Sequence, residues 1–237
     1  MIPREVNRTR ALGALALSLA CTPAGSAKQG AESTTVTRPE SASVAARPAP
    51  TDSNITRADL ARIQGSPKAP LWVIEVSDFQ CPYCKEWHDQ TYNTFRDQFV
   101  KTGKVRLAYV NFPLSSHVHA WPAAETAMCA GAQGKFWEMH DALFATQAHW
   151  EAMTAPSVVF DSLARANGLD MASWRNCVSS GKMRPLIQAD QDRAARAGAS
   201  ATPSFMIGDK ILTGAQPIEE LRRAIDSAMV KSNKTTP

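Results

Sequence analysis

The chain has 237 residues, 44% of them hydrophobic and 20% charged, which supports one folded core of ordinary size plus some unstructured length and excludes a wholly disordered protein. Its formal charge is +4, but three arginines and one glutamate lie in the first ten residues, so the remainder carries about +2. So small a surplus argues against a nucleic-acid or membrane-surface partner.

Residues 1–21 carry an export signal pattern: a basic stretch, the apolar run "ALGALALSLA" and then Cys21. Ten apolar residues are too few to span a bilayer, which needs about 20. The segment "LSLAC" resembles a lipoprotein signal, in which the cysteine becomes lipidated and N-terminal, so we expect a lipid anchor at Cys21. Alternatively, Cys21 is incidental and cleavage follows Ala27.

Residues 22–54 are rich in Ser, Thr, Ala and Pro and have no apolar period. This composition predicts a solvated tether, long enough to hold a domain away from a membrane surface. The folded domain is therefore expected at 55–232.

The first predicted elements surround a Cys-Pro-Tyr-Cys motif. The run "PLWVIEV" at 70–76 predicts a buried strand, and "KVRLAYVNF" at 104–112 predicts a second one that stops at Pro113. Between them a helix is expected, with one face formed by Cys81, Cys84, Trp87, His88, Tyr92, Phe95 and Phe99. The spacing of Cys81 and Cys84 alone fits a metal clip, a structural staple or a redox pair.

The stretch from about 117 to 198 has only helical patterns, which predicts an all-helical block. After it, "TPSFMIGDKILTGAQ" predicts a hairpin with its turn at Gly208-Asp209, and an amphipathic helix ends the domain. The order is therefore strand, helix, strand, helical block, hairpin and helix.

This order resembles the thioredoxin fold, an α/β fold, and the helical insertion between the second strand and Thr202-Pro203 resembles the DsbA-like thiol:disulfide oxidoreductases. The resemblance rests on "SDFQCPYC", "PAAETAMCAGAQGKFWEMHDALF", "GASATPSFMIG" and "LTGAQPIEELRRAI", which together cover nearly the whole domain. The motif with its strand, the late Thr-Pro and the insertion is far more specific than C-x-x-C alone.

The two cysteines of the motif have different predicted roles. Cys81 lies at a helix N-terminus, where unpaired backbone N–H groups and the helix dipole favour a thiolate, so we expect it to be the nucleophile. Cys84, one turn deeper, is expected to be the resolving thiol. Pro82 suits the first helical turn, and Pro82 with Tyr83 is expected to meet the substrate.

The resemblance implies two further site elements. It implies a cis bond before Pro203, which would present the backbone of Thr202 to an extended substrate; the alternative is an ordinary trans proline that starts a strand. It also implies that Glu75, inside an apolar strand, moves a proton to or from Cys84. The alternative for Glu75 is that its side chain leaves the sheet edge for water.

Metal binding is the alternative for several histidines. Cys81, Cys84 and His88 could be three zinc ligands, but no fourth is evident, and His117 with His119 could form a metal pair, although H-x-H is more often structural. We expect neither a metal nor a cofactor. His140 and the tryptophans of the helical block are expected to pack in the core.

Five cysteines in an exported chain leave one unpaired, and lipidation of Cys21 would remove it. For Cys129 and Cys177 the resemblance implies a second disulfide, since related proteins of this branch sometimes carry one in the insertion. The alternative is two buried free thiols.

The resulting hypothesis is an extracytoplasmic thiol:disulfide oxidoreductase, acting as an oxidase on exported proteins and re-oxidised by a membrane partner. We expect a monomer, anchored by lipid at a periplasmic or outer membrane face. A reductase or isomerase of the same fold is the first alternative, although no dimerisation domain precedes the catalytic one. A tethered binding or metal module without turnover is the second.

Overall fold

The computed structural model describes residues 52–235. The predicted export signal, Cys21 and the tether up to residue 51 lie outside this part of the chain. Helix α1 (Ser53–Ala61) begins two residues before the predicted domain boundary, because Asp52 caps it: its Oδ1 accepts a hydrogen bond from Asn54 N at 2.7 Å. Within residues 52–235, no helix is both long and apolar enough to cross a membrane.

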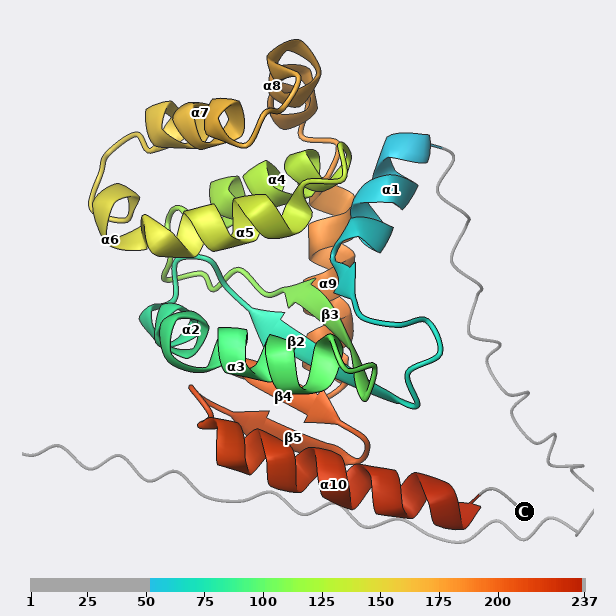
Figure 1. Ribbon diagram of the computed structural model, residues 1–237. Coiled ribbons are helices and arrows are strands. Elements are labelled where there is room, and N and C mark those ends of the chain that lie inside the picture. The colour runs from blue at the N-terminus through green and yellow to red at the C-terminus, as the bar shows by residue number, and fades with distance from the viewer. Residues whose placement is uncertain (1–51, 236–237) are drawn as a thin grey trace, which may run out of the picture. The chain divides into compact units, whose positions relative to one another are not determined.

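A five-stranded sheet lies at the centre of the fold, in the order β1-β3-β2-β4-β5 (Figure 1). Strands β2 and β3 are parallel, and the other neighbours are antiparallel. The strands are β1 (Ile63–Gln64), β2 (Leu71–Ser77), β3 (Val105–Asn111), β4 (Ser204–Ile207) and β5 (Lys210–Thr213). The hairpin β4–β5 turns at Gly208-Asp209, as the sequence predicts.

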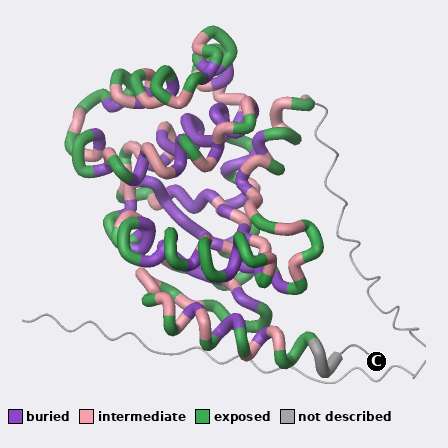
Figure 2. The backbone as a smooth tube through the Cα atoms, viewed as in Figure 1, coloured by how far each residue is buried: buried purple, intermediate pink, exposed green. Residues whose placement is uncertain are grey.

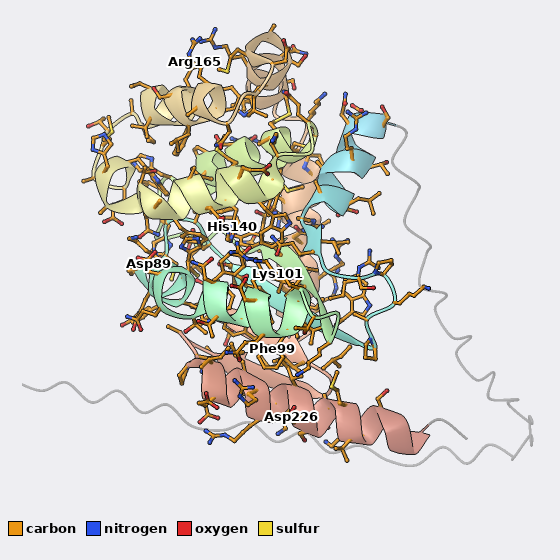
Figure 3. The ribbon with its side chains drawn as sticks, viewed as in Figure 1. Asp89, Phe99, Lys101, His140, Arg165 and Asp226 are labelled. Atoms are coloured by element: carbon orange, nitrogen blue, oxygen red, sulfur yellow. A yellow bond between two sulfur atoms is a disulfide. The ribbon has the colours of Figure 1, made fainter. Side chains whose placement is uncertain are left out.

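The helix after the motif is underwound. It consists of α2 (Pro82–Trp87), the π-helical segment η1 (His88–Tyr92), α3 (Asn93–Phe95) and the π-helical segment η2 (Arg96–Val100). Buried residues of this helix recur at spacings of three and four residues, so they share one face: Cys84, Trp87, His88, Tyr92, Phe95 and Phe99. That face packs on the sheet beside α10 (Ile218–Thr235), and Figure 3 shows Phe99 at this contact.

The predicted insertion is helical throughout and lies above the sheet in the view of Figure 1, apart from α9, which packs on β3. Its helices are α4 (Ala120–Gly131), α5 (Phe136–Ala145), α6 (Gln147–Trp150), α7 (Ser157–Ala166), α8 (Met171–Ser180) and α9 (Arg184–Arg196). Figure 2 shows that α4 and the central strands β2, β3 and β4 are mostly buried, whereas α7 and α8 expose much of their surface. The predicted fold class, a thioredoxin-like α/β fold with an inserted helical region, is confirmed.

Candidate active site around Cys81 and Cys84

Cys81 and Cys84 lie where β2 gives way to α2. Cys81 is the N-cap residue of α2 with an extended backbone, Pro82 is the first helical residue, and both cysteines are free thiols. Only 3% of the Cys81 surface is exposed and Cys84 is fully buried, so of the two cysteines only Cys81 reaches the surface. Tyr83 between them is 62% exposed.

The surroundings of the two thiols shift their pKa values in opposite directions. The Cys84 thiol, together with the Thr202 side chain and the backbone N–H groups of Cys84 and Tyr83, lowers the pKa of Cys81 to about 6 against the opposing effect of burial. Burial and the neighbouring Cys81 raise the pKa of Cys84 well above its ordinary value. At neutral pH the outer sulfur is therefore a thiolate, while the inner one keeps its proton.

The loop before β4 lies directly against Cys81. The Thr202-Pro203 peptide bond is cis, and Cys81 Sγ lies 3.4 Å from the carbonyl oxygen of Thr202, to which the thiol donates a hydrogen bond when it is protonated. Thr202 is itself buried. In this reduced state the carbonyl of Thr202 therefore faces the outer sulfur.

Glu75 is buried in the middle of the sheet. Strand β2 pairs on both sides, with Tyr109 and Phe205 as the partners of Glu75, so its side chain cannot leave a sheet edge for water. Burial raises the pKa of Glu75 to about 8. The nearby Ser77 hydroxyl offsets part of that shift, although neither Ser77 Oγ nor the Glu75 carboxylate reaches hydrogen-bonding geometry with any group. Such a carboxyl group can exchange a proton near neutral pH.

Comparisons with known proteins agree with this arrangement. A family model described as Thioredoxin matches residues 58–227. The Na(+)/H(+) antiporter NhaA 1 of Salinispora arenicola is 33% identical over 171 residues, covering 72% of this chain and 25% of the antiporter. Disulfide bond formation protein D of Bacillus subtilis is 21% identical over 169 residues, covering 70% of this chain and 76% of that protein. The chain thus spans about a quarter of the length of the antiporters that it matches.

Solved structures have the same fold. The alpha-DsbA1 protein of Wolbachia pipientis superposes with a TM-score of 0.65 at 21% identity, covering 74% of this chain and 94% of that one. A thioredoxin-like oxidoreductase from Silicibacter pomeroyi gives a TM-score of 0.60 at 26% identity, covering 76% and 98%. This chain belongs to the DsbA-like thioredoxin-fold family.

Sequence reasoning missed the residues that hold the active-site loops of this DsbA-like protein together. Asp78 accepts a hydrogen bond from Leu114 N at 2.9 Å and contacts His117 Nδ1 at 2.7 Å, and its own N–H donates to Cys84 Sγ at 3.5 Å. Gln147 Nε2 donates to the carbonyl of Cys81 at 3.1 Å. The only signal for Asp78 was a charged residue at the end of an apolar strand, and Gln147 had none.

The histidines weighed as metal ligands are held by other partners. His117 binds Asp78, and His119 Nε2 donates to the carbonyl of Met153 at 2.7 Å, so the two do not form a pair. His88 Nε2 and His140 Nδ1 lie 3.3 and 2.8 Å from Asp141 Oδ1. Within residues 52–235 this trio is the only group of three candidate metal ligands, and it contains neither cysteine of the motif.

His140 is the most deeply buried member of the trio. It is fully buried, and burial lowers its pKa to about 4, so the ring is neutral. Figure 3 shows it between α5 and the helix that begins at Pro82. His88 lies on η1 and Asp141 lies on α5, so the contact between them joins the helical insertion to the helix that begins at Pro82.

The remaining two described cysteines form a disulfide in this DsbA-like protein. Cys129 of α4 and Cys177 of α8 are joined with an S–S distance of 2.00 Å, and both are buried. The bond closes a loop across 48 residues inside the helical insertion.

Proposed function

We propose that this protein is an extracytoplasmic thiol:disulfide oxidoreductase that exchanges its Cys81–Cys84 disulfide with exported proteins and works mainly as an oxidase. The observation that carries the proposal is the pairing of a helix-capping Cys81, against the cis Thr202-Pro203 loop, with a buried Cys84 behind it. The relatives named disulfide bond formation protein D support the same class of reaction.

In the oxidase direction the reaction is two thiol–disulfide exchanges. A substrate thiolate attacks Cys81 Sγ, the Cys81–Cys84 bond breaks, and Cys84 leaves and takes up a proton. A second substrate thiolate then attacks the substrate sulfur of the mixed disulfide and releases Cys81 as a thiolate. The substrate loses two electrons and the cysteine pair gains them. In the reverse direction, Cys84 attacks the mixed disulfide.

The low pKa of Cys81 supports the oxidase direction. A pKa of about 6 makes Cys81 a good leaving group and stabilises the reduced protein at neutral pH, so the disulfide form is the stronger oxidant. Glu75, with a pKa of about 8, is the group proposed to supply or remove the Cys84 proton.

The substrate is proposed to lie as an extended chain across the loop of Thr202 and Pro203. Backbone pairing there gives affinity without sequence preference, which suits an enzyme that acts on many unfolded proteins. Pro82 and the exposed ring of Tyr83 add contact on the other side of Cys81.

The location and partners follow from the sequence before the domain. An export signal, lipidation at Cys21 and a tether would place a monomer at the outer face of a membrane, where newly exported thiols are its substrates. A membrane redox partner would re-oxidise Cys81 and Cys84.

Two measurements on the exported protein test this function. Cys84→Ala should accumulate substrate adducts on Cys81 in a non-reducing gel, and Cys81→Ala, the matched control, should accumulate none. Equilibration with a glutathione buffer should show a potential well above that of thioredoxin, which is about −270 mV. A thioredoxin-like potential would make the protein a reductase or isomerase, and absence of adducts would leave a module without turnover.

A further inference from the structure

Three buried polar side chains of β2 and β3 have no hydrogen-bond partner. They are the carboxylate of Glu75, the hydroxyl of Ser77 and the phenol of Tyr109, and all three residues are fully buried. Buried polar groups are nearly always paired, so a cluster of unpaired ones at a reactive centre calls for an explanation. Ser77 is the member that directly precedes Asp78, the residue whose N–H donates to Cys84 Sγ.

The strand geometry brings these groups together. Glu75 and Ser77 are two residues apart on β2, so their side chains emerge from the same face of the sheet. Tyr109 on β3 is the register partner of Glu75. The residue after Ser77, Asp78, donates its N–H to Cys84 Sγ at 3.5 Å, which fixes the end of the strand against the inner thiol.

We propose that the Ser77 hydroxyl relays the proton between Cys84 and Glu75. The inference rests on the proposed function, because the relay serves the step in which Cys84 attacks the mixed disulfide, and the reverse of that step, in which Cys84 leaves and takes up a proton, begins the oxidase reaction. In molecules in which Glu75 is ionised, a fraction that grows as the pH rises toward about 8, the S–H proton of Cys84 passes to Ser77 Oγ and the Ser77 proton passes to the Glu75 carboxylate as Cys84 attacks the mixed disulfide. Ser77 ends unchanged, Glu75 becomes neutral, and the Cys84 electron pair forms the new disulfide as the substrate sulfur leaves from Cys81.

Ser77 affects the pKa of both groups that the relay would connect, Cys84 and Glu75. The Ser77 hydroxyl lowers the pKa of Cys84, against burial and Cys81, and also lowers that of Glu75, against burial. Besides burial, only Ser77 and Asp141 shift the pKa of Glu75. Ser77 and Tyr109 both interact with the thiol and the carboxyl group, and Ser77 is the one that lies on the same strand and the same face as Glu75.

The other ionisable groups that face the relay are few. They are Tyr109 on β3, Tyr92 on η1, Asp141 on α5, and Asp78 with Cys81 at the start of α2. Burial raises the pKa of both tyrosines, so neither ionises near neutral pH. Glu75 is therefore the base that sets the pH dependence of the relay.

The test is a single-turnover measurement of the resolving step. Cys81 is loaded as a mixed disulfide with glutathione, and release of glutathione is followed from pH 5 to pH 9 in wild type, Ser77→Ala, Ser77→Thr and Glu75→Gln. We expect Ser77→Ala to slow release about 10- to 100-fold near neutral pH and Ser77→Thr to restore most of it. Thr126→Val, which removes a buried hydroxyl in α4, is the matched control and should release glutathione at the wild-type rate.

Two further readouts separate a relay from a structural role. Ser77→Ala should leave the alkylation rate of Cys81 unchanged, and in a Glu75→Gln background it should slow release less than about twofold, because both changes break one path. Wild-type release in Ser77→Ala, or fully additive effects, would overturn the relay and leave the proposed function intact. If wild type itself never releases glutathione, the proposed function fails and the relay with it.

Discussion

The two cysteine pairs of this protein differ in their bonding and in the elements that hold them. Cys81 and Cys84 lie at a helix start, beside a cis-proline loop and a buried carboxyl group, and the structure leaves them as thiols. Cys129 and Cys177 join α4 and α8 of the insertion as a disulfide, although both pairs belong to the same apolar cluster. Unequal stabilisation of two thiolates suits turnover, whereas a buried disulfide that links two helices suits a permanent bond. The following variants test this division.

Replacing the outer thiol should have the largest effect. Cys81→Ser removes the group that attacks and leaves, so oxidation of a reduced model substrate should fall at least about 10³-fold. Thermal unfolding should change little, because the serine keeps the size of the side chain. Substantial activity in this variant would show that another thiol does the chemistry.

Glu75→Gln should change how stability depends on pH. The folded protein holds the Glu75 proton up to about pH 8, whereas the unfolded chain releases it near 4.5, so wild-type stability falls as pH rises through this window. The free energy of unfolding falls by as much as about 5 kcal/mol across this window, and a glutamine at this position removes the fall because it does not titrate.

The measurement is urea unfolding of the reduced protein at pH 5 and pH 8. From pH 5 to pH 8 we expect the free energy of unfolding to fall less in Glu75→Gln than in wild type. In the exposed control Glu86→Gln it should fall as much as in wild type. An equal pH dependence in wild type and Glu75→Gln would mean that Glu75 is ionised in the fold.

Removing the second pair should lower the stability of the protein and leave its exchange activity, the opposite of what is expected for Cys81→Ser. A Cys129→Ala/Cys177→Ala protein should lose up to about 4 kcal/mol of unfolding free energy, because the unfolded chain regains the freedom of a 48-residue loop. Denaturant unfolding measures that loss, and exchange at Cys81 should remain within about twofold of wild type. A large loss of exchange in the folded variant would contradict separate roles for the pairs.

The smallest effect is expected on the pKa of Cys81 when Cys84 is replaced by alanine. The hydrogen bond from the Cys84 thiol is the largest cause of the low pKa of Cys81, so its removal should raise that pKa from about 6 toward its ordinary value. The thiolate absorbance of Cys81 against pH, read in the ultraviolet, gives the midpoint. An unchanged midpoint would assign the shift to Thr202 and the backbone of α2 instead.

Much of the fold could be predicted because its signals are local. The apolar runs predict β2 and β3, the Gly208-Asp209 turn predicts the hairpin, and the periodic patterns predict a helical insertion. The π-helical turns after Trp87 and the start of α1 at Ser53 were not predicted. The first depends on packing of one helix face on the sheet, and the second on a single capping side chain.

The sequence by itself determined where the chemistry lies: two cysteines at a strand–helix junction and a Thr-Pro late in the chain. Only the tertiary structure decided how the site is tuned, because it brings Thr202 to Cys81 across 121 residues and buries Glu75 beside Ser77 and Tyr109. Desolvation and contacts between distant residues set which sulfur ionises and which group holds the proton. Neither can be read from spacing, since each depends on what the folded chain places around the atom.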